Sequence, residues 1–188
     1  MKELYDLSYS LLNKYVKLKR LQWHAYATEA IMKDLAVYLN EDKDKWGIAG
    51  LLHDLDIEFT YSDVTKHTLE TKVILNNLVF PNDVIDAICM HNDKASNQKR
   101  SEKFHFALSS SDALSGFIAY VISAKHSNLI KELHVESVYE CLLDHNFAKH
   151  YDKTPIFEYE YLKIDIKTFI SIGVDAMKKA SNKIGFNN

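Results

Sequence analysis

The sequence predicts an all-α fold, a single-domain bundle of helices. Glycine and proline are scarce, at five and two among 188 residues, so few positions interrupt a helix. Apolar residues recur at spacings of three and four along most of the chain, and no segment keeps the strict alternation of a strand. The hydrophobic share of 47% is normal for a globular protein, and the length is sufficient for one sizeable core. We therefore expect residues 1–188 to form one helical domain.

The N-terminal part of the chain divides into three predicted helices. Leucines and Tyr15 share one face of an amphipathic helix over residues 4–15. A second periodic run over 21–39 is rich in alanine and aliphatic residues, and the polar residues 40–44 connect it to the next segment. That third segment, 45–52, is apolar on most sides, so we expect it to be buried.

The middle of the chain is predicted to hold a loop and two helices. Residues 55–64 mix acidic and aromatic side chains without a steady period, which indicates a loop. The helical pattern resumes over 65–78. Its inner face is predicted to carry Val73, Ile74 and Leu78. Pro81-Asn82-Asp83 then favours a turn and a helix cap, because asparagine and aspartate accept hydrogen bonds from the free amides of a first turn, and this helix ends near His91.

The remaining part is predicted to be dominated by one long helix. Residues 92–103 form the most polar stretch and precede a helix over about 102–123. Asp112 lies in this helix among serines and a glycine, which allow another helix to approach closely, so we expect Asp112 to face inward. The last elements are predicted helices at 135–143 and 165–184, an irregular connector at 156–166, and Gly185 as the cap of the final helix.

Charge and targeting signals narrow the possible partners and location. The net charge of -3, with acids and bases interspersed, gives no basic surface for duplex nucleic acid or an anionic membrane. Cys89 and Cys141 have no CxxC spacing, so we expect buried thiols rather than a zinc ribbon or a disulfide framework. No signal peptide is apparent, and no window approaches eighteen uninterrupted apolar residues, which predicts a cytoplasmic protein.

A histidine and an aspartate stand side by side where the apolar segment 49–52 ends. A charged pair at the end of a buried helix caps the helix, pairs with a cation or binds a metal ion. Taken alone, such residues are more often capping or hydrogen-bonded groups than ligands. Here they belong to a set of metal-compatible side chains on helices that converge in a bundle: His24, His53, Asp54, His67, His91 and Asp112. Imidazole and carboxylate without thiolate favour Fe, Mn, Zn, Ni or Co.

The order of these residues resembles the HD-domain metal-dependent phosphohydrolase superfamily. The resemblance is carried by His24, by Ala49-Gly50-Leu51-Leu52-His53-Asp54 and by Ser111-Asp112-Ala113-Leu114. It covers about residues 20–125 and leaves 126–188 as a helical extension. His67 and His91 stand where two-metal members place additional histidines. The chain departs from many relatives at Leu55-Asp56-Ile57, where they have Ile-Gly-Lys, and at Glu70-Thr71, where they have glycine.

The resemblance implies a fold, a cofactor and an activity. A first divalent metal ion would be held by His24, His53, Asp54 and Asp112, and Asp54 would bridge to a second ion held by His67 and His91. The implied reaction is hydrolysis of a nucleotide or another small phosphate ester or anhydride, including dinucleoside polyphosphates, by a metal-activated water. The alternatives are a di-iron oxygenase of the same fold and a non-catalytic, metal-stabilised ligand sensor, because a fold and a metal do not fix a reaction.

Residues in the loops complete the predicted site. Asp56 and Glu58 are candidates for orienting the water or for hydrogen bonds to the ligand histidines, the alternative being solvated loop acids. Lys94, Arg100 and Lys125 are candidates for binding a phosphorylated substrate, the alternative being surface charges that only aid solubility. Trp23, beside His24, either packs against the fold or lines the pocket.

Overall fold

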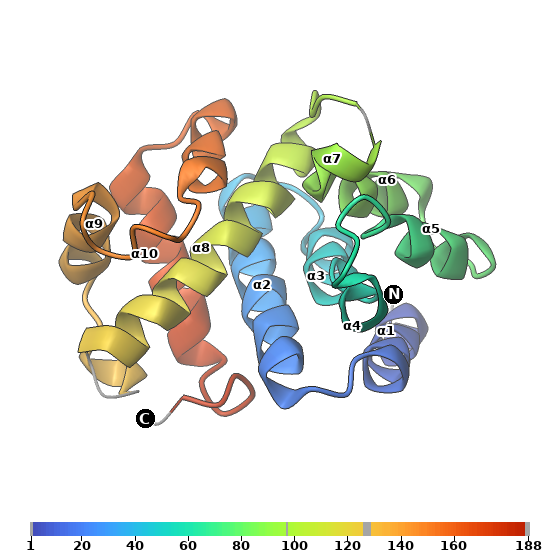
Figure 1. The fold of residues 1–188 in the computed structure, drawn as a ribbon, viewed down its shortest axis with the longest axis horizontal. Coiled ribbons are helices and arrows are strands. Elements are labelled where there is room, and N and C mark those ends of the chain that lie inside the picture. Colours follow the sequence, from blue (N-terminus) through green and yellow to red (C-terminus); the bar gives the residue numbers. More distant parts are fainter. Residues whose placement is uncertain (1, 97, 126–128, 187–188) are drawn as a thin grey trace.

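A computed structural model describes residues 2–96, 98–125 and 129–186 (Figure 1). Over these ranges the chain is helical and contains no strand, which confirms the all-α prediction. The α-helices are α1 Lys2–Tyr15, α2 Lys19–Tyr38, α3 Lys43–Leu52, α4 Ile57–Thr60, α5 Leu69–Asn76, α6 Asn82–His91, α7 Asp93–Ser96, α8 Lys103–Lys125, α9 Val135–Leu143 and α10 Ile166–Lys179. Two 3-10 helices, η1 Ile130–Glu132 and η2 Thr154–Leu162, join the last helices.

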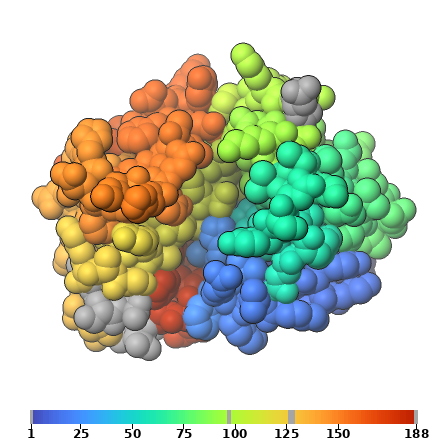
Figure 2. Space-filling view, in the orientation of Figure 1, coloured from blue at the N-terminus to red at the C-terminus, as the bar shows by residue number. Residues whose placement is uncertain are grey.

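Helix α2 lies at the centre of the molecule. It packs against α3 on one side and α10 on the other, and α8 crosses it (Figure 1). Helices α3 to α7 gather on one side of α2, and α9, α10 and η2 gather on the other. The space-filling view shows this face hollowed between α8 and the segment around residues 55–65, with α2 at the bottom of the hollow (Figure 2).

Helix α8 links the two halves of the core. Its fully buried side chains include Leu108, Leu114, Phe117 and Ile118, which pack with apolar residues of α2, α6 and α10. The helix is long and apolar enough to cross a membrane by length and composition, but two thirds of that window (67%) is buried within the fold, as in a core helix. The small residues predicted to permit close approach do so, since the Ser115 Oγ lies 3.0 Å from the Thr28 Oγ1 of α2.

The predicted helix over 65–78 is shorter than expected and shows a different face to the core. It begins at Leu69, after Thr68 in a left-handed conformation (φ 81°), so His67 precedes the helix. Thr71 and Leu75 are buried on its inner face, whereas Val73 and Leu78, predicted to face inward, are exposed. Ile74 is partly buried against the core.

Several predicted boundaries and connectors are also corrected. Asn82 and Asp83 lie inside α6, and Pro81 takes the cap position without a side-chain hydrogen bond. Asp83 nevertheless accepts from the first-turn amide of Val84 through Oδ1 at 3.1 Å, while its Oδ2 pairs with Lys45 Nζ at 2.7 Å. The predicted loop over 55–64 contains the short helix α4, and the polar stretch 92–103 contains α7. The predicted connector over 156–166 overlaps η2. The last helix ends at Lys179, so Gly185 does not cap it.

Candidate metal centre

The fold brings together the six side chains that the sequence singled out. They come from α2, from the end of α3 and the turn after it, from the loop before α5, from the last residue of α6 and from α8: His24, His53, Asp54, His67, His91 and Asp112. The cluster is closed at its base, where the His53 side chain is 0% exposed, and open at His24 and Asp112, which are 24% and 30% exposed.

The two oxygens of Asp54 face two different pairs of imidazoles. Its Oδ2 lies 3.7 Å from the Nε2 of His24 and 3.5 Å from the Nε2 of His53. Its Oδ1 lies 3.1 Å from the Nε2 of His67 and 3.6 Å from the Nε2 of His91. Asp54 therefore stands between two groups of ligand atoms.

Asp112 belongs to the first of these groups. Its Oδ1 lies 2.8 Å from the Nε2 of His24 and 3.4 Å from the Nε2 of His53. Because α8 presents this carboxylate across the crossing with α2, the expected inward orientation of Asp112 is toward the cluster. The first group then comprises two imidazoles and two carboxylates, and the second comprises two imidazoles and the shared Asp54.

Two of the imidazoles are oriented by the main chain of their own helices. The Nδ1 of His53 donates to the carbonyl of Gly50 at 2.8 Å, and the Nδ1 of His91 donates to the carbonyl of Ile88 at 2.7 Å. A carbonyl only accepts, so the hydrogen is on Nδ1 in both rings. Their Nε2 atoms are thereby directed at the cluster.

Side chains orient the other two imidazoles. The Nδ1 of His67 donates to Asp56 Oδ1 at 2.7 Å. The Nδ1 of His24 lies 3.1 Å from the Oγ of Ser115, which itself donates to the carbonyl of Asp112 at 2.9 Å and so is free to accept from the ring. Such outer hydrogen bonds fix the tautomer and angle of metal-binding histidines. The role of Ser115 was not predicted, although its position three residues after Asp112 places both on one face of α8.

The donor set fits divalent metal ions. The Nε2 atoms of His24 and His53 are 3.2 Å apart, and those of His67 and His91 are 3.1 Å apart. Since each Nδ1 bears the hydrogen, unprotonated Nε2 lone pairs would face each other and repel unless a cation or proton lay between them. Atoms of His24, His53 and Asp112, and atoms of His53, Asp54 and His91, lie within 4.8 Å of one another, close enough to share an ion.

Charge within the cluster shifts the pKa of its members. Burial lowers the pKa of His53, but Asp54 and Asp112 outweigh it and raise that pKa to about 9. Burial also lowers the pKa of His67, but Asp54 and Asp56 outweigh it and raise that pKa to about 10. At His91 burial dominates and the pKa is lowered. Burial opposes ionisation of Asp54, yet the surrounding imidazoles hold its pKa well below the usual range.

We expect the pH dependence of stability to change sign when metal is removed. In the metal-free protein the raised pKa values of His53 and His67 give a stabilisation that is complete below about pH 6.5 and is lost as pH rises toward 9 and 10. Stability should therefore fall by about 2 kcal/mol for each of the two groups between pH 6.5 and 8.5, or on the order of 4 kcal/mol together. Metal binding requires unprotonated imidazoles, so the loaded protein should gain stability over the same range.

Thermal unfolding at both pH values, with a chelator and with added Mn²⁺, measures this effect. The same direction of change in the two sets would contradict the assignment of His53 and His67 as ligands.

Asp56 is fully buried and both of its oxygens are engaged. Oδ1 accepts from His67, and Oδ2 accepts from the backbone amides of Thr68 at 2.8 Å and Thr71 at 3.0 Å. Of the two roles predicted for Asp56, the geometry provides the hydrogen bond to a candidate ligand histidine. The carboxylate is 0% exposed, so it does not face solvent from which a reacting water would come. The same carboxylate satisfies free amides at the start of α5.

Replacing Asp56 with asparagine should weaken the second metal site selectively. The amide can keep one acceptor but places an NH₂ group against amides or against Nδ1–H, so the His67 ring should lose its fixed angle. We expect a 10–100-fold loss of affinity for one of two metal ions, measured by calorimetric titration of the chelator-treated protein. Glu58→Gln is the control from the same segment and should bind both ions normally. Equal affinities in Asp56→Asn and the unmodified protein would contradict this role.

Glu58 is not placed at the cluster. Its Oε1 accepts from the backbone amides of Lys17 and Leu18, both at 2.6 Å, so it ties α4 to the linker between α1 and α2. The prediction that it orients a water or bonds a ligand histidine is therefore corrected. Its partners are about 40 residues distant in the chain.

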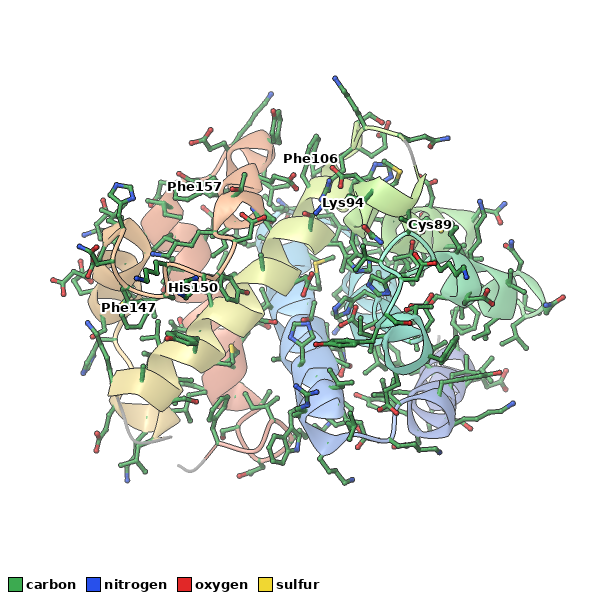
Figure 3. The ribbon with its side chains drawn as sticks, viewed as in Figure 1. Cys89, Lys94, Phe106, Phe147, His150 and Phe157 are labelled. Carbon is green, nitrogen blue, oxygen red and sulfur yellow. The ribbon has the colours of Figure 1, made fainter. Side chains whose placement is uncertain are left out.

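Two of the three predicted substrate-binding bases are engaged elsewhere. Arg100 lies near Asp93 at 3.0 Å and Glu158 at 3.3 Å, and donates to the carbonyl of His91 at 3.2 Å, so it supports the main chain at the end of α6. Lys125 lies thirteen residues after Asp112 on the same helix, about 20 Å along its axis, and stands over the ring of Phe147 (labelled in Figure 3).

Lys94 differs from the other two. It extends from α7 as an exposed side chain near the N-terminal end of α8, and it forms no ion pair with the residues that the structure describes (Figure 3). Hydrogen bonds from Thr154 chiefly lower the pKa of Asp152 in the segment before η2, and the positive charge of Lys94 makes a smaller contribution. Lys94 therefore stays a candidate for contact with a charged substrate.

Comparison with known proteins gives one match. A family model described as the HD domain matches residues 23–151, which include all six clustered side chains. No curated protein and no solved structure matches the chain.

Proposed function

The chain belongs to the HD-domain superfamily of metal-dependent phosphohydrolases, and from this premise we propose that it hydrolyses a small phosphate ester or anhydride, such as a nucleotide, at a centre of two divalent metal ions. One observation, made on this chain itself, supports the two-ion centre. The two oxygens of Asp54 face separate pairs of imidazoles, His24 with His53 and His67 with His91, which is the arrangement that a carboxylate bridging two ions requires.

Each residue of the centre has a distinct task in this proposal. His24, His53 and Asp112 would hold the first ion, His67 and His91 the second, and Asp54 both. Bound in this way, two ions would polarise a phosphoryl oxygen and activate a water molecule for in-line attack. Ser115 and Asp56 position the rings of His24 and His67, so their Nε2 atoms would already be oriented for binding the ions before substrate arrives. Imidazole and carboxylate donors suit Fe, Mn, Zn, Ni or Co.

The open side of the centre favours a small, charged substrate. Solvent reaches the cluster at His24 and Asp112, so a phosphate group can approach there while the base of the site stays closed by His53. Lys94 is the candidate among the predicted bases for contact with a further charged group. The net charge of -3, with acids and bases interspersed, provides no basic surface for duplex nucleic acid or an anionic membrane. The proposed partner is therefore a small phosphorylated molecule, and the proposed location is the cytoplasm.

Metal content and product release test the function together. The protein is purified without added metal, its metals are quantified, and phosphate release is measured with a panel of nucleotides and other phosphate esters in the presence of each candidate ion. We expect about two ions per chain and metal-dependent release of phosphate without uptake of oxygen. One ion per chain would contradict the bridging role of Asp54. Oxygen uptake without phosphate release would instead support a di-iron oxygenase, and neither activity would favour a ligand sensor.

A further inference from the structure

We propose that the substrate carries a flat aromatic group, which binds in an apolar pocket beside the metal centre. This inference rests on the proposed function, since it places the reacting phosphate at the cluster. The pocket has a volume of about 390 Å³, within the range of ~300–1,000 Å³ that small-molecule sites occupy. It lies between α2, α8 and the C-terminal segment, which meet on the hollowed face of the molecule (Figure 2).

The pocket and the centre share two side chains. His24 and Ser115 line the pocket, and the same His24 ring directs its Nε2 at Asp112 Oδ1. On α8 the face that carries Asp112 continues through Ser115 to Ala119, at the helical spacing of three and four residues, and Ala119 lines the pocket. A substrate with its phosphate at the open side of the cluster can therefore extend directly into this space.

The walls are chemically suited to an aromatic group. Apolar side chains form most of the lining: Trp23, Ala27, Ala119, Met177, Ile184 and Phe186. Arg20 is the one fixed positive charge among the described lining residues, it is exposed, and it makes no ion pair within the part of the chain that the structure describes. An apolar cavity with a single cation at its rim favours a flat, weakly polar group attached to an anion.

Trp23 is held in place as one wall of the pocket. Gly185 has a positive φ of 74°, and a Cβ at that position would lie 2.5 Å from the Trp23 ring, so only glycine lets the backbone approach the indole this closely. Trp23 nevertheless stays 40% exposed. A large aromatic side chain that is both fixed by the backbone and partly open offers a preformed contact surface for a ligand ring.

Much of the pocket comes from outside the matched family region. The match covers residues 23–151, whereas Arg20 precedes it and Met177, Ile184 and Phe186 follow it. The metal-binding residues all lie inside the match. The segment after α10 thus forms one wall of the pocket, beside a metal cluster that lies within the HD domain. Selection of the substrate is therefore assigned to the C-terminal extension of this chain.

Paired substrates and a pocket-filling variant test the proposal. The pairs keep the phosphate and change only the group attached to it: adenosine 5′-monophosphate against ribose 5-phosphate, and phenyl phosphate against methyl phosphate. We expect the unmodified protein to prefer the ring-bearing member by at least ~10-fold in kcat/KM. Ala119→Leu should reduce this preference by ~10-fold or more, mainly by raising KM, because the added side chain fills the cavity. Ala30→Leu is the matched control elsewhere on the bundle and should keep the preference.

A binding measurement separates this proposal from the proposed function. Adenosine and benzyl alcohol, which lack phosphate, should change the fluorescence of Trp23, and Ala119→Leu should abolish the change while Ala30→Leu retains it. Trp46 is buried and stacked on Phe104, so it should respond little. Saturable binding of adenosine or benzyl alcohol, without hydrolysis of any phosphate compound, would contradict the proposed function and still support the pocket as a site for an aromatic group.

Hydrolysis of both members of each pair with equal kcat/KM, unaltered in Ala119→Leu, would contradict the role of the pocket. A preference within one pair alone identifies a nucleobase or a simple aryl group.

Discussion

Replacing Asp54 with asparagine is expected to lower metal-dependent phosphate release by at least ~10³-fold, the largest loss from any single substitution at the centre. The amide is nearly isosteric but carries no negative charge, and it offers one acceptor where the carboxylate offers two. Both groups of imidazoles would then lose their shared ligand. The second ion should be lost outright, because His67 and His91 have no other carboxylate oxygen of the cluster between them.

Metal content and activity are measured on the same preparation of Asp54→Asn, with circular dichroism to establish that the helices remain. Asp6→Asn, on the exposed face of α1, is the matched control and should keep both ions and full activity. Two ions per chain in Asp54→Asn, with undiminished activity, would refute the bridging role.

Replacing Gly50 with alanine is expected to destabilise the fold by about 2 kcal/mol. A Cβ at this position would lie 2.8 Å from the carbonyl oxygen of Thr28, which belongs to the backbone of α2 and cannot rotate away. Helix α3 would have to move off α2 at the point where Gly50 accepts the hydrogen bond from His53. Alanine favours a helix over glycine by about 1 kcal/mol, which offsets only part of this overlap. Metal affinity should fall together with stability.

Gly173→Ala is a suitable contrast, measured by the same denaturant titration. Its Cβ would meet the ends of the Leu114 and Ile118 side chains at 2.8 and 3.0 Å, and these can shift by a change of rotamer. We expect its free energy of unfolding to stay within about 1 kcal/mol of the original. If Gly50→Ala were as stable as Gly173→Ala, tight packing of backbone against backbone would not be what positions α3.

The long elements and the membership of the cluster were predictable from the sequence. Helical periodicity over α1, α2 and α8 reflects burial of one face, which the order of residues records directly. The helices α4 and α7 were missed because a four-residue helix has no stability of its own and depends on its surroundings. The inner face of α5 was misjudged because this short helix packs chiefly on α6 and buries only Thr71 and Leu75. Its late start was missed because no local pattern signals the left-handed conformation of Thr68.

Partners distant in sequence explain the errors at the site. Glu58 looked like a candidate beside the His53-Asp54 pair, but the amides that it accepts from belong to the linker before α2. Arg100 looked like a free base, but Asp93 and Glu158 surround it. The ligand role of the six clustered residues stays a prediction. The pocket wall around Trp23 could not be predicted from the sequence, because it depends on the segment after α10 packing against the N-terminal part of α2.

The hydrogen bonds to the four Nδ1 atoms have a consequence for how the centre can change over evolutionary time. His53 and His91 are aimed by carbonyl groups, which every residue possesses, so no substitution can delete the acceptor. His24 and His67 depend on the side chains of Ser115 and Asp56, which mutation can replace. Each proposed ion thus has one ligand histidine whose ring orientation is set by the backbone and one whose orientation depends on a replaceable side chain. Selection could therefore change the affinity of either metal site while leaving the other site intact.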